Sequence, residues 1–156
     1  MDGAIERRMD CAMEVKILAL LDRHRIMTLA TLRPDGWPQA TTVGYVSEDL
    51  TLYFLCSPFS QKARNLARDD RVSLTIDHDT PDLMAITGLS MAGHARVVED
   101  PAEAGRVLRA LPLKYPETPA LPMPGPDQVR LFRITPKVIS VLEYTQGFGH
   151  ADLVAY

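Results

Sequence analysis

The stretch LYFLCSPFSQKARNLARDDRVSLTID, residues 52–77, decides the fold. It begins with an apolar run typical of a buried strand, and the Ser-Pro-Phe that follows ends this run because proline lacks a backbone donor. Ser60 is a favourable N-cap for a helix over residues 61–68. Residues 71–77 then alternate apolar and polar side chains, as a half-buried strand does. The stretch therefore predicts a strand, a loop, a short helix and a second strand.

Further elements extend from this stretch in both directions. They are helices over residues 14–24 and 100–111, strands over residues 26–32, 37–46, 50–56, 85–98 and 137–144, and a short strand near the C-terminus. The Pro-Asp-Gly between the first two strands is a turn signal, because proline presets φ and glycine accepts positive φ. We expect the first three strands to form an antiparallel meander. Gly88 and Gly93 predict a bend or a bulge within their strand.

These elements predict a mainly β protein of the α+β class. Residues 112–126 carry six of the twelve prolines and are expected to form no regular element. The rest gives six or seven antiparallel strands with two or three flanking helices, which suits a closed or partly closed barrel. The chain has 156 residues, of which 46% are hydrophobic. Because it contains no internal repeat, we expect one domain over residues 1–156.

Composition and charge exclude several classes of protein. A net charge of -3 gives no electrostatic attraction to nucleic acid. Cys11 and Cys56 share no motif, and the four histidines lack metal-ligand spacing, so neither a disulfide scaffold nor a metal site is expected. The N-terminus lacks a signal-peptide pattern, and no apolar run approaches a spanning helix. We therefore expect a cytoplasmic protein without membrane contact.

The first turn of the helix after Ser60 is the strongest candidate for chemistry. A helix N-terminus offers free N–H groups and a positive dipole end, and Lys62 adds to that field where an acidic residue would oppose it. With hydroxyl and amide donors from Ser57, Ser60 and Gln61, the arrangement suits a phosphate. The alternative is an ordinary capped helix on the surface. The chain has no Walker or Rossmann loop, no Gly-x-Ser-x-Gly elbow and no evident catalytic acid or base.

Four motifs in the same order give the sequence a family resemblance. They are IMTLATLRPDGWPQATTV, LYFLCSPFSQKARNL, RVSLTI and GHARVVED, spread from about Glu14 to Val98. With them the chain resembles the pyridoxamine 5'-phosphate oxidase-like flavoproteins, which are split β-barrels that bind flavin mononucleotide (FMN). The resemblance implies an FMN-binding split β-barrel that works as a homodimer with its sites at the interface.

The resemblance also implies a cofactor site. The phosphate would lie on Ser60, Gln61 and Lys62, where Gln61 departs from the family's arginine and loses a charge. The phosphate and ribityl chain would run along the preceding strand end, and the ring would lie beside the second strand, where Ala40 stands in place of an arginine. The residues implied beside the cofactor on these two strands are Thr41, Thr42, Val43, Leu55, Cys56 and Ser57.

The partner subunit is implied to complete the site. Its strand over residues 87–91 and its C-terminal region would reach the flavin, with Phe148, or else Tyr144, covering the ring. Ala151 falls near the place of the oxidase's substrate-binding arginine. Oxidation of pyridoxamine phosphate is therefore not expected of this chain.

The expected function is an FMN-dependent oxidoreductase that passes hydride or electrons to an unidentified small molecule, since the cofactor carries the redox chemistry. No residue is assigned a catalytic role. One alternative is a flavin-binding or sensing protein without turnover. Another is a member of the same fold that binds a deazaflavin, or that binds haem through His94 or His150.

Overall fold

The computed structural model describes residues 2–118, 125 and 127–156. Within these residues the chain forms three α-helices, two short 3₁₀ turns and eight strands. In chain order they are α1 (Asp2–Arg23), β1 (Ile26–Leu32), β2 (Pro38–Gly44), β3 (Val46–Glu48), β4 (Thr51–Cys56), α2 (Gln61–Arg68), β5 (Arg71–Asp77), η1 (Leu83–Ala85), β6 (Thr87–Val97), α3 (Pro101–Lys114), β7 (Arg130–Glu143), η2 (Tyr144–Gln146) and β8 (Ala151–Ala155).

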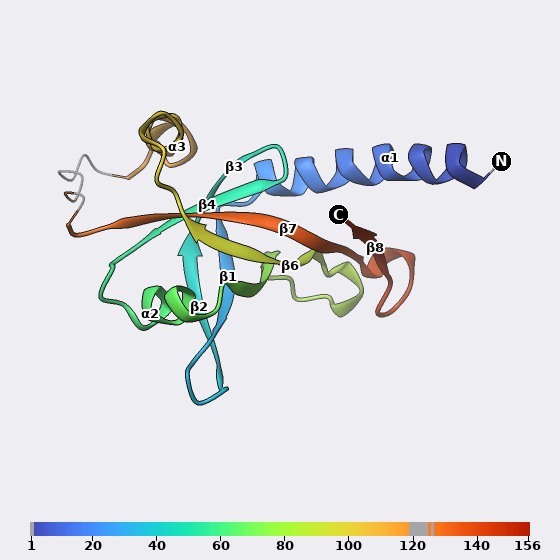
Figure 1. Ribbon diagram of the computed structural model, residues 1–156. Coiled ribbons are helices and arrows are strands. Elements are labelled where there is room, and N and C mark those ends of the chain that lie inside the picture. Colours follow the sequence, from blue (N-terminus) through green and yellow to red (C-terminus); the bar gives the residue numbers. More distant parts are fainter. Residues whose placement is uncertain (1, 119–124, 126) are drawn as a thin grey trace.

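The strands form one antiparallel sheet in the order β2-β1-β5-β6-β7-β4-β3, with β8 added on β7. The sheet curls until β2, at one edge, approaches β4 near the other edge (Figure 1). The predicted α+β split barrel is therefore confirmed, and the short β3 raises the number of strands to eight. None of the helices among the described residues combines the length and the apolarity needed to cross a bilayer.

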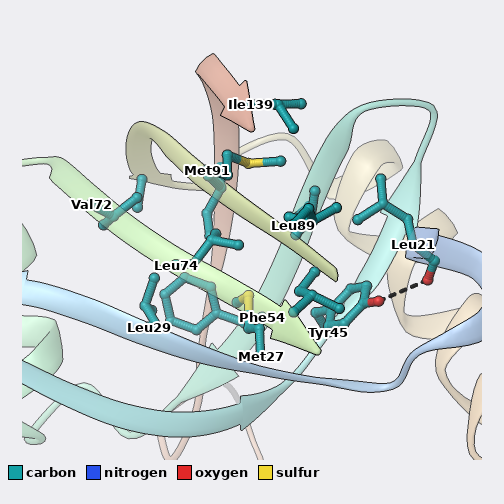
Figure 2. Packing of buried hydrophobic residues seen from close by; sticks show 14 of the residues in the cluster. Leu21, Met27, Leu29, Tyr45, Phe54, Val72, Leu74, Leu89, Met91 and Ile139 are labelled. Atoms are coloured by element: carbon teal, nitrogen blue, oxygen red, sulfur yellow. Dashed lines mark hydrogen bonds between the residues drawn. The ribbon is translucent and has the colours of Figure 1, made fainter. Parts of the chain in front are cut away.

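The core fills the inside of the curled sheet. Alternate residues of the strands point inward, as Met27 and Leu29 of β1 do, and both are buried. Figure 2 shows these side chains packed with residues of β4, β5 and β6. The last turns of α1 cover one end of the barrel, where the hydroxyl of the buried Tyr45 donates to the Leu21 carbonyl oxygen at 2.8 Å.

Glycines act in the structure as the sequence predicts. Gly36 has φ +85 in the β1–β2 turn, and its N–H donates to the Arg33 carbonyl oxygen at 2.9 Å. The pairing of β6 with β7 shifts by one residue between Ala92 and Gly93. A Cβ on Gly93 would lie 2.5 Å from the Thr135 oxygen, so the bulge depends on the missing side chain.

Three expectations need correction. The expected meander is wrong for its third strand, because β4 pairs with β3 and β7 and not with β2. The expectation of no regular structure from residue 112 onward is wrong for 112–114, which complete α3 with Pro112 inside it. The rest of the proline-rich segment includes residues 119–124 and 126, which lie outside the described residues. The first helix is also longer than its apolar pattern, since it begins at Asp2.

Candidate functional site

Two strand edges face the opening of the barrel. Within the described residues β2 pairs with β1 and with no other strand, and this edge strand carries the predicted Thr41, Thr42 and Val43. On the other side, β3 pairs with β4 only as far as Tyr53. The outer edge of β4 beyond that residue therefore has no strand partner within the described residues. The split between these edges offers main-chain N–H and C=O groups to a ligand.

The side chains along these edges point in different directions. Thr41 and Val43 are half-buried on one face of β2, whereas Ala40 and Thr42 are exposed on the other. At the end of β4 the Cys56 side chain packs against the barrel core. Leu55 instead packs under α3 in a second apolar cluster, so only its main chain adjoins the split.

The loop into α2 is fixed by its own hydroxyls. The Ser60 oxygen accepts from the N–H of Ala63 at 3.1 Å and donates to the Ser57 carbonyl oxygen at 2.8 Å. The Ser57 hydroxyl oxygen accepts from the N–H of Phe59. The next two N–H groups, those of Gln61 and Lys62, meet no acceptor within the described residues. These two N–H groups remain available to an anion.

Two cations, Lys62 and Arg130, lie near this helix start. The first turn of α2 contains no acidic residue, and neither Lys62 nor Arg130 has an ion-pair partner in the part of the chain that the structure describes. Arg130 is brought here because it pairs with Cys56 at the start of β7. Burial raises the pKa of the Cys56 thiol, while Ser60 and the charges of Lys62 and Arg130 oppose this. Cys56 is therefore a neutral thiol beside a positive patch, and Arg130 is a residue that the sequence reasoning missed.

Gln61 does not point freely toward this patch. Its side-chain amide donates to the Asn65 oxygen at 2.8 Å, and its own oxygen accepts from Arg64 at 3.0 Å. Asn65 is fully buried and donates to the oxygen of Thr31 at 2.9 Å and of Gln39 at 3.2 Å. This polar network, made of Gln61, Asn65, Thr31 and Gln39, ties α2 to β1 and β2. It positions the helix start relative to the split.

One chain does not bring Phe148 to the split. Phe148 follows β7, and its ring is 77% exposed and packs edge-on against Tyr144 at 5.7 Å between centroids. The other end of β7 carries Arg130, and a strand of 14 residues spans roughly 45 Å if straight. In Figure 1, α2 and β8 accordingly lie on opposite sides of the molecule. Only a second chain can place Phe148 near Lys62.

The two histidines considered for haem both have carboxylate partners. His94 Nδ1 lies 2.8 Å from an Asp70 oxygen, and Arg96 contacts the other oxygen of the same carboxylate at 2.8 Å. His150 Nε2 lies 3.1 Å from an Asp152 oxygen, on the side of Phe148. The two histidines therefore sit at different places, and neither lies beside the split.

Comparison with known proteins assigns the family. The sequence profile described as pyridoxamine 5'-phosphate oxidase matches residues 13–143. A Listeria innocua protein, named provisionally as a pyridoxamine 5'-phosphate oxidase, has a TM-score of 0.70 at 24% identity, over 84% of this chain and 98% of that one. An F420 reductase has a TM-score of 0.63 at 26% identity, over 78% of this chain and 94% of that one.

A heme binding protein from Mycobacterium smegmatis has the same fold. Its TM-score is 0.68 at 23% identity, over 91% of this chain and 56% of that one. The fold thus recurs in structures whose names point to different cofactors, and at identities below 25% the likeness concerns the fold alone. The profile match covers most of the sequence and the neighbours share the curled sheet. The chain belongs to the pyridoxamine 5'-phosphate oxidase family.

Proposed function

We propose that this chain binds FMN in the split of the barrel and works as an FMN-dependent oxidoreductase. The observation that carries the proposal is the positive patch at the start of α2. A lysine in the first turn of a helix opposes the helix dipole, and here neither Lys62 nor Arg130 is neutralised by a carboxylate within the described residues. A bound phosphate would offset both charges.

The positive patch would also compensate for the two positions, Ala40 and Gln61, at which the family's arginines are missing. Ala40 carries no charge, and Gln61 is engaged with Asn65. Arg130 would supply the second cation in their place, while the N–H groups of Gln61 and Lys62 would bind phosphate oxygens. Ser57 and Ser60 would act mainly by holding the loop in shape.

The flavin ring would lie along the open edge of β2. The main-chain groups of Thr41 to Val43 on that edge suit the polar rim of an isoalloxazine, and the exposed Thr42 can add a hydroxyl. FMN, when bound, supplies hydride or electron transfer to the unidentified small molecule. The residues of the chain hold and orient it, and we assign none of them the role of acid or base.

Titration with FMN tests the proposal. Lys62→Ala should weaken FMN binding by roughly 1.5–3 kcal/mol, because a charge-assisted hydrogen bond is lost. Arg130→Ala should also weaken it. The control is Lys137→Ala, since Lys137 is exposed in the middle of β7. Unchanged affinity in Lys62→Ala would place the phosphate elsewhere, and no flavin retention by the wild type would remove the proposal.

A homodimer belongs to the same proposal, because Phe148 can cover the flavin only from a second chain. Mixing Lys62→Ala chains with Phe148→Ala chains tests this. In a mixed dimer, one site would carry both changes and the other neither, so sites of native FMN affinity should appear on mixing. If no such sites appear although light scattering detects dimers, Phe148 does not act across the interface.

Three alternatives to this proposal can each be tested by a measurement. A deazaflavin would use the same positive patch, and the F420 reductase of this fold gives that choice its support. Binding of FMN without reduction by NADH or NADPH and without substrate-dependent reoxidation would favour a flavin-binding or sensing protein. Haem is the second cofactor alternative, and a Soret band lost on changing His94 or His150 would support it.

A further inference from the structure

Two histidines far apart in the sequence meet at the end of the barrel covered by α1. His24 follows α1 and His78 follows β5, and their Nε2 and Nδ1 atoms lie 3.4 Å apart. His24 is 8% exposed, whereas His78 is exposed to solvent. The ring planes are inclined by 30° and the ring centroids are 5.5 Å apart, so the rings are offset rather than in full face-to-face contact, with these two nitrogens 3.4 Å apart.

The protein fixes the tautomer of His24. Its Nδ1 lies 2.9 Å from the Leu20 carbonyl oxygen, which can only accept, so Nδ1 carries the hydrogen. The Nε2 of the neutral ring is then a bare lone pair, and it faces His78. A ring N–H held by a main-chain carbonyl is also the usual support of a histidine that binds metal through its other nitrogen.

The distance between the two facing nitrogens suits a shared metal ion better than a direct hydrogen bond. An N–H···N contact of 3.4 Å is longer than the roughly 2.9–3.0 Å of a good hydrogen bond. Two imidazoles that each bind Zn²⁺ at about 2.05 Å and stand 3.4 Å apart enclose an angle of about 110° at the metal, close to the tetrahedral value.

We propose that His24 and His78 form a two-histidine site for a first-row divalent ion such as Zn²⁺, with water in the remaining positions. Among the described residues no group of three His, Cys, Asp or Glu side chains could hold a metal. The site is therefore open and of modest affinity, unlike the closed four-ligand sites that hold structural zinc. The ion would fasten the end of α1 to the loop after β5, across β1.

Zinc titration of the full chain, stripped with a chelator, tests the site. The exposed Cys11 thiol is itself a zinc ligand, so every protein compared carries Cys11→Ser. We expect about one Zn²⁺ to bind per chain at pH 7.5. His78→Ala should weaken zinc binding at least about tenfold, because even the loss of a group that only supports a metal ligand lowers affinity by about 10- to 100-fold.

His94→Ala is the matched control and should leave zinc binding unchanged, because His94 pairs with Asp70 elsewhere on the molecule. In NMR spectra the ring signals of His24 and His78 should move together on adding Zn²⁺. Equal binding by His78→Ala, or no binding by the wild type at millimolar Zn²⁺, overturns the proposal. Lys62→Ala should bind zinc normally, so this test and the FMN test can fail separately.

Discussion

Replacing Asn65 by alanine should loosen α2 from the strands that border the split. Asn65 is fully buried and takes part in three hydrogen bonds, to Thr31, Gln39 and Gln61, at 2.8–3.2 Å. Each bond contributes about 0.5–1.5 kcal/mol to stability, and Thr31, only 2% exposed, would lose its partner in a dry site. Gln39 and Gln61 can turn to water, which limits the loss. We therefore expect Asn65→Ala to lower the free energy of unfolding by about 2–4 kcal/mol.

Urea unfolding measures this loss. The midpoint should fall while the slope stays constant, because the surface exposed on unfolding hardly changes. Ala67→Ser, at an exposed position of the same helix that takes no part in the network, is the control and should change stability by about 0.5 kcal/mol or less. A loss below about 1 kcal/mol in Asn65→Ala would mean that water replaces the network. The claim that the network positions the helix start would then be refuted.

Three further predictions concern the rest of the fold. Burial lowers the pKa of Lys114 to about 8, although the Leu21 carbonyl oxygen and the Tyr45 ring partly offset the cost of burying the charge. Because the unfolded chain then binds more protons than the folded one, the free energy of unfolding should rise from pH 8 to about 10 in the wild type and not in Lys114→Met. A hydrogen bond from Arg133 holds the pKa of Glu103 below its usual value. The wild type should therefore be more stable than Glu103→Gln at neutral pH and lose this advantage as the pH falls through that lowered pKa, and a constant difference in unfolding free energy down to about pH 3 would contradict this. Gly93→Ala should cost about 1–3 kcal/mol in thermal unfolding, because the added Cβ meets a β7 carbonyl, and a variant as stable as the wild type would contradict this.

Local signals in the sequence predicted most of the secondary structure. The cap at Ser60 and the alternation over residues 71–77 are properties of neighbouring residues, and α2 and β5 begin and end where they indicate. Pairing between distant strands carries no such signal. The sequence could not tell that β4 pairs with β7, because that choice depends on which apolar faces meet in the core. The start of β7 was missed for the same reason.

The same difference between local and long-range signals separates the site residues that were predicted from those that were missed. Lys62 was found because its place in the first turn of α2 is unusual in itself. Arg130 was missed because the pairing of Cys56 with the start of β7, which brings it near the proposed phosphate position, carries no signal in the sequence. Asn65 was missed because a buried asparagine is recognised by its partners, and those partners lie on two other strands.

The position of Phe148 links the cofactor hypothesis to a second chain. The sequence can rank it as an aromatic residue next to a Gln-Gly pair, and the structure adds that its ring is exposed at the far end of β7 from Lys62. Phe148 at one end of β7 and Lys62 near the other end cannot contact one flavin within a monomer. If both serve it, the two ends must belong to different chains, related so that each chain supplies both. Because Phe148 and Lys62 lie at opposite ends of β7, the cofactor hypothesis requires a symmetric assembly in which each chain supplies both residues. The mixing experiment tests this requirement directly.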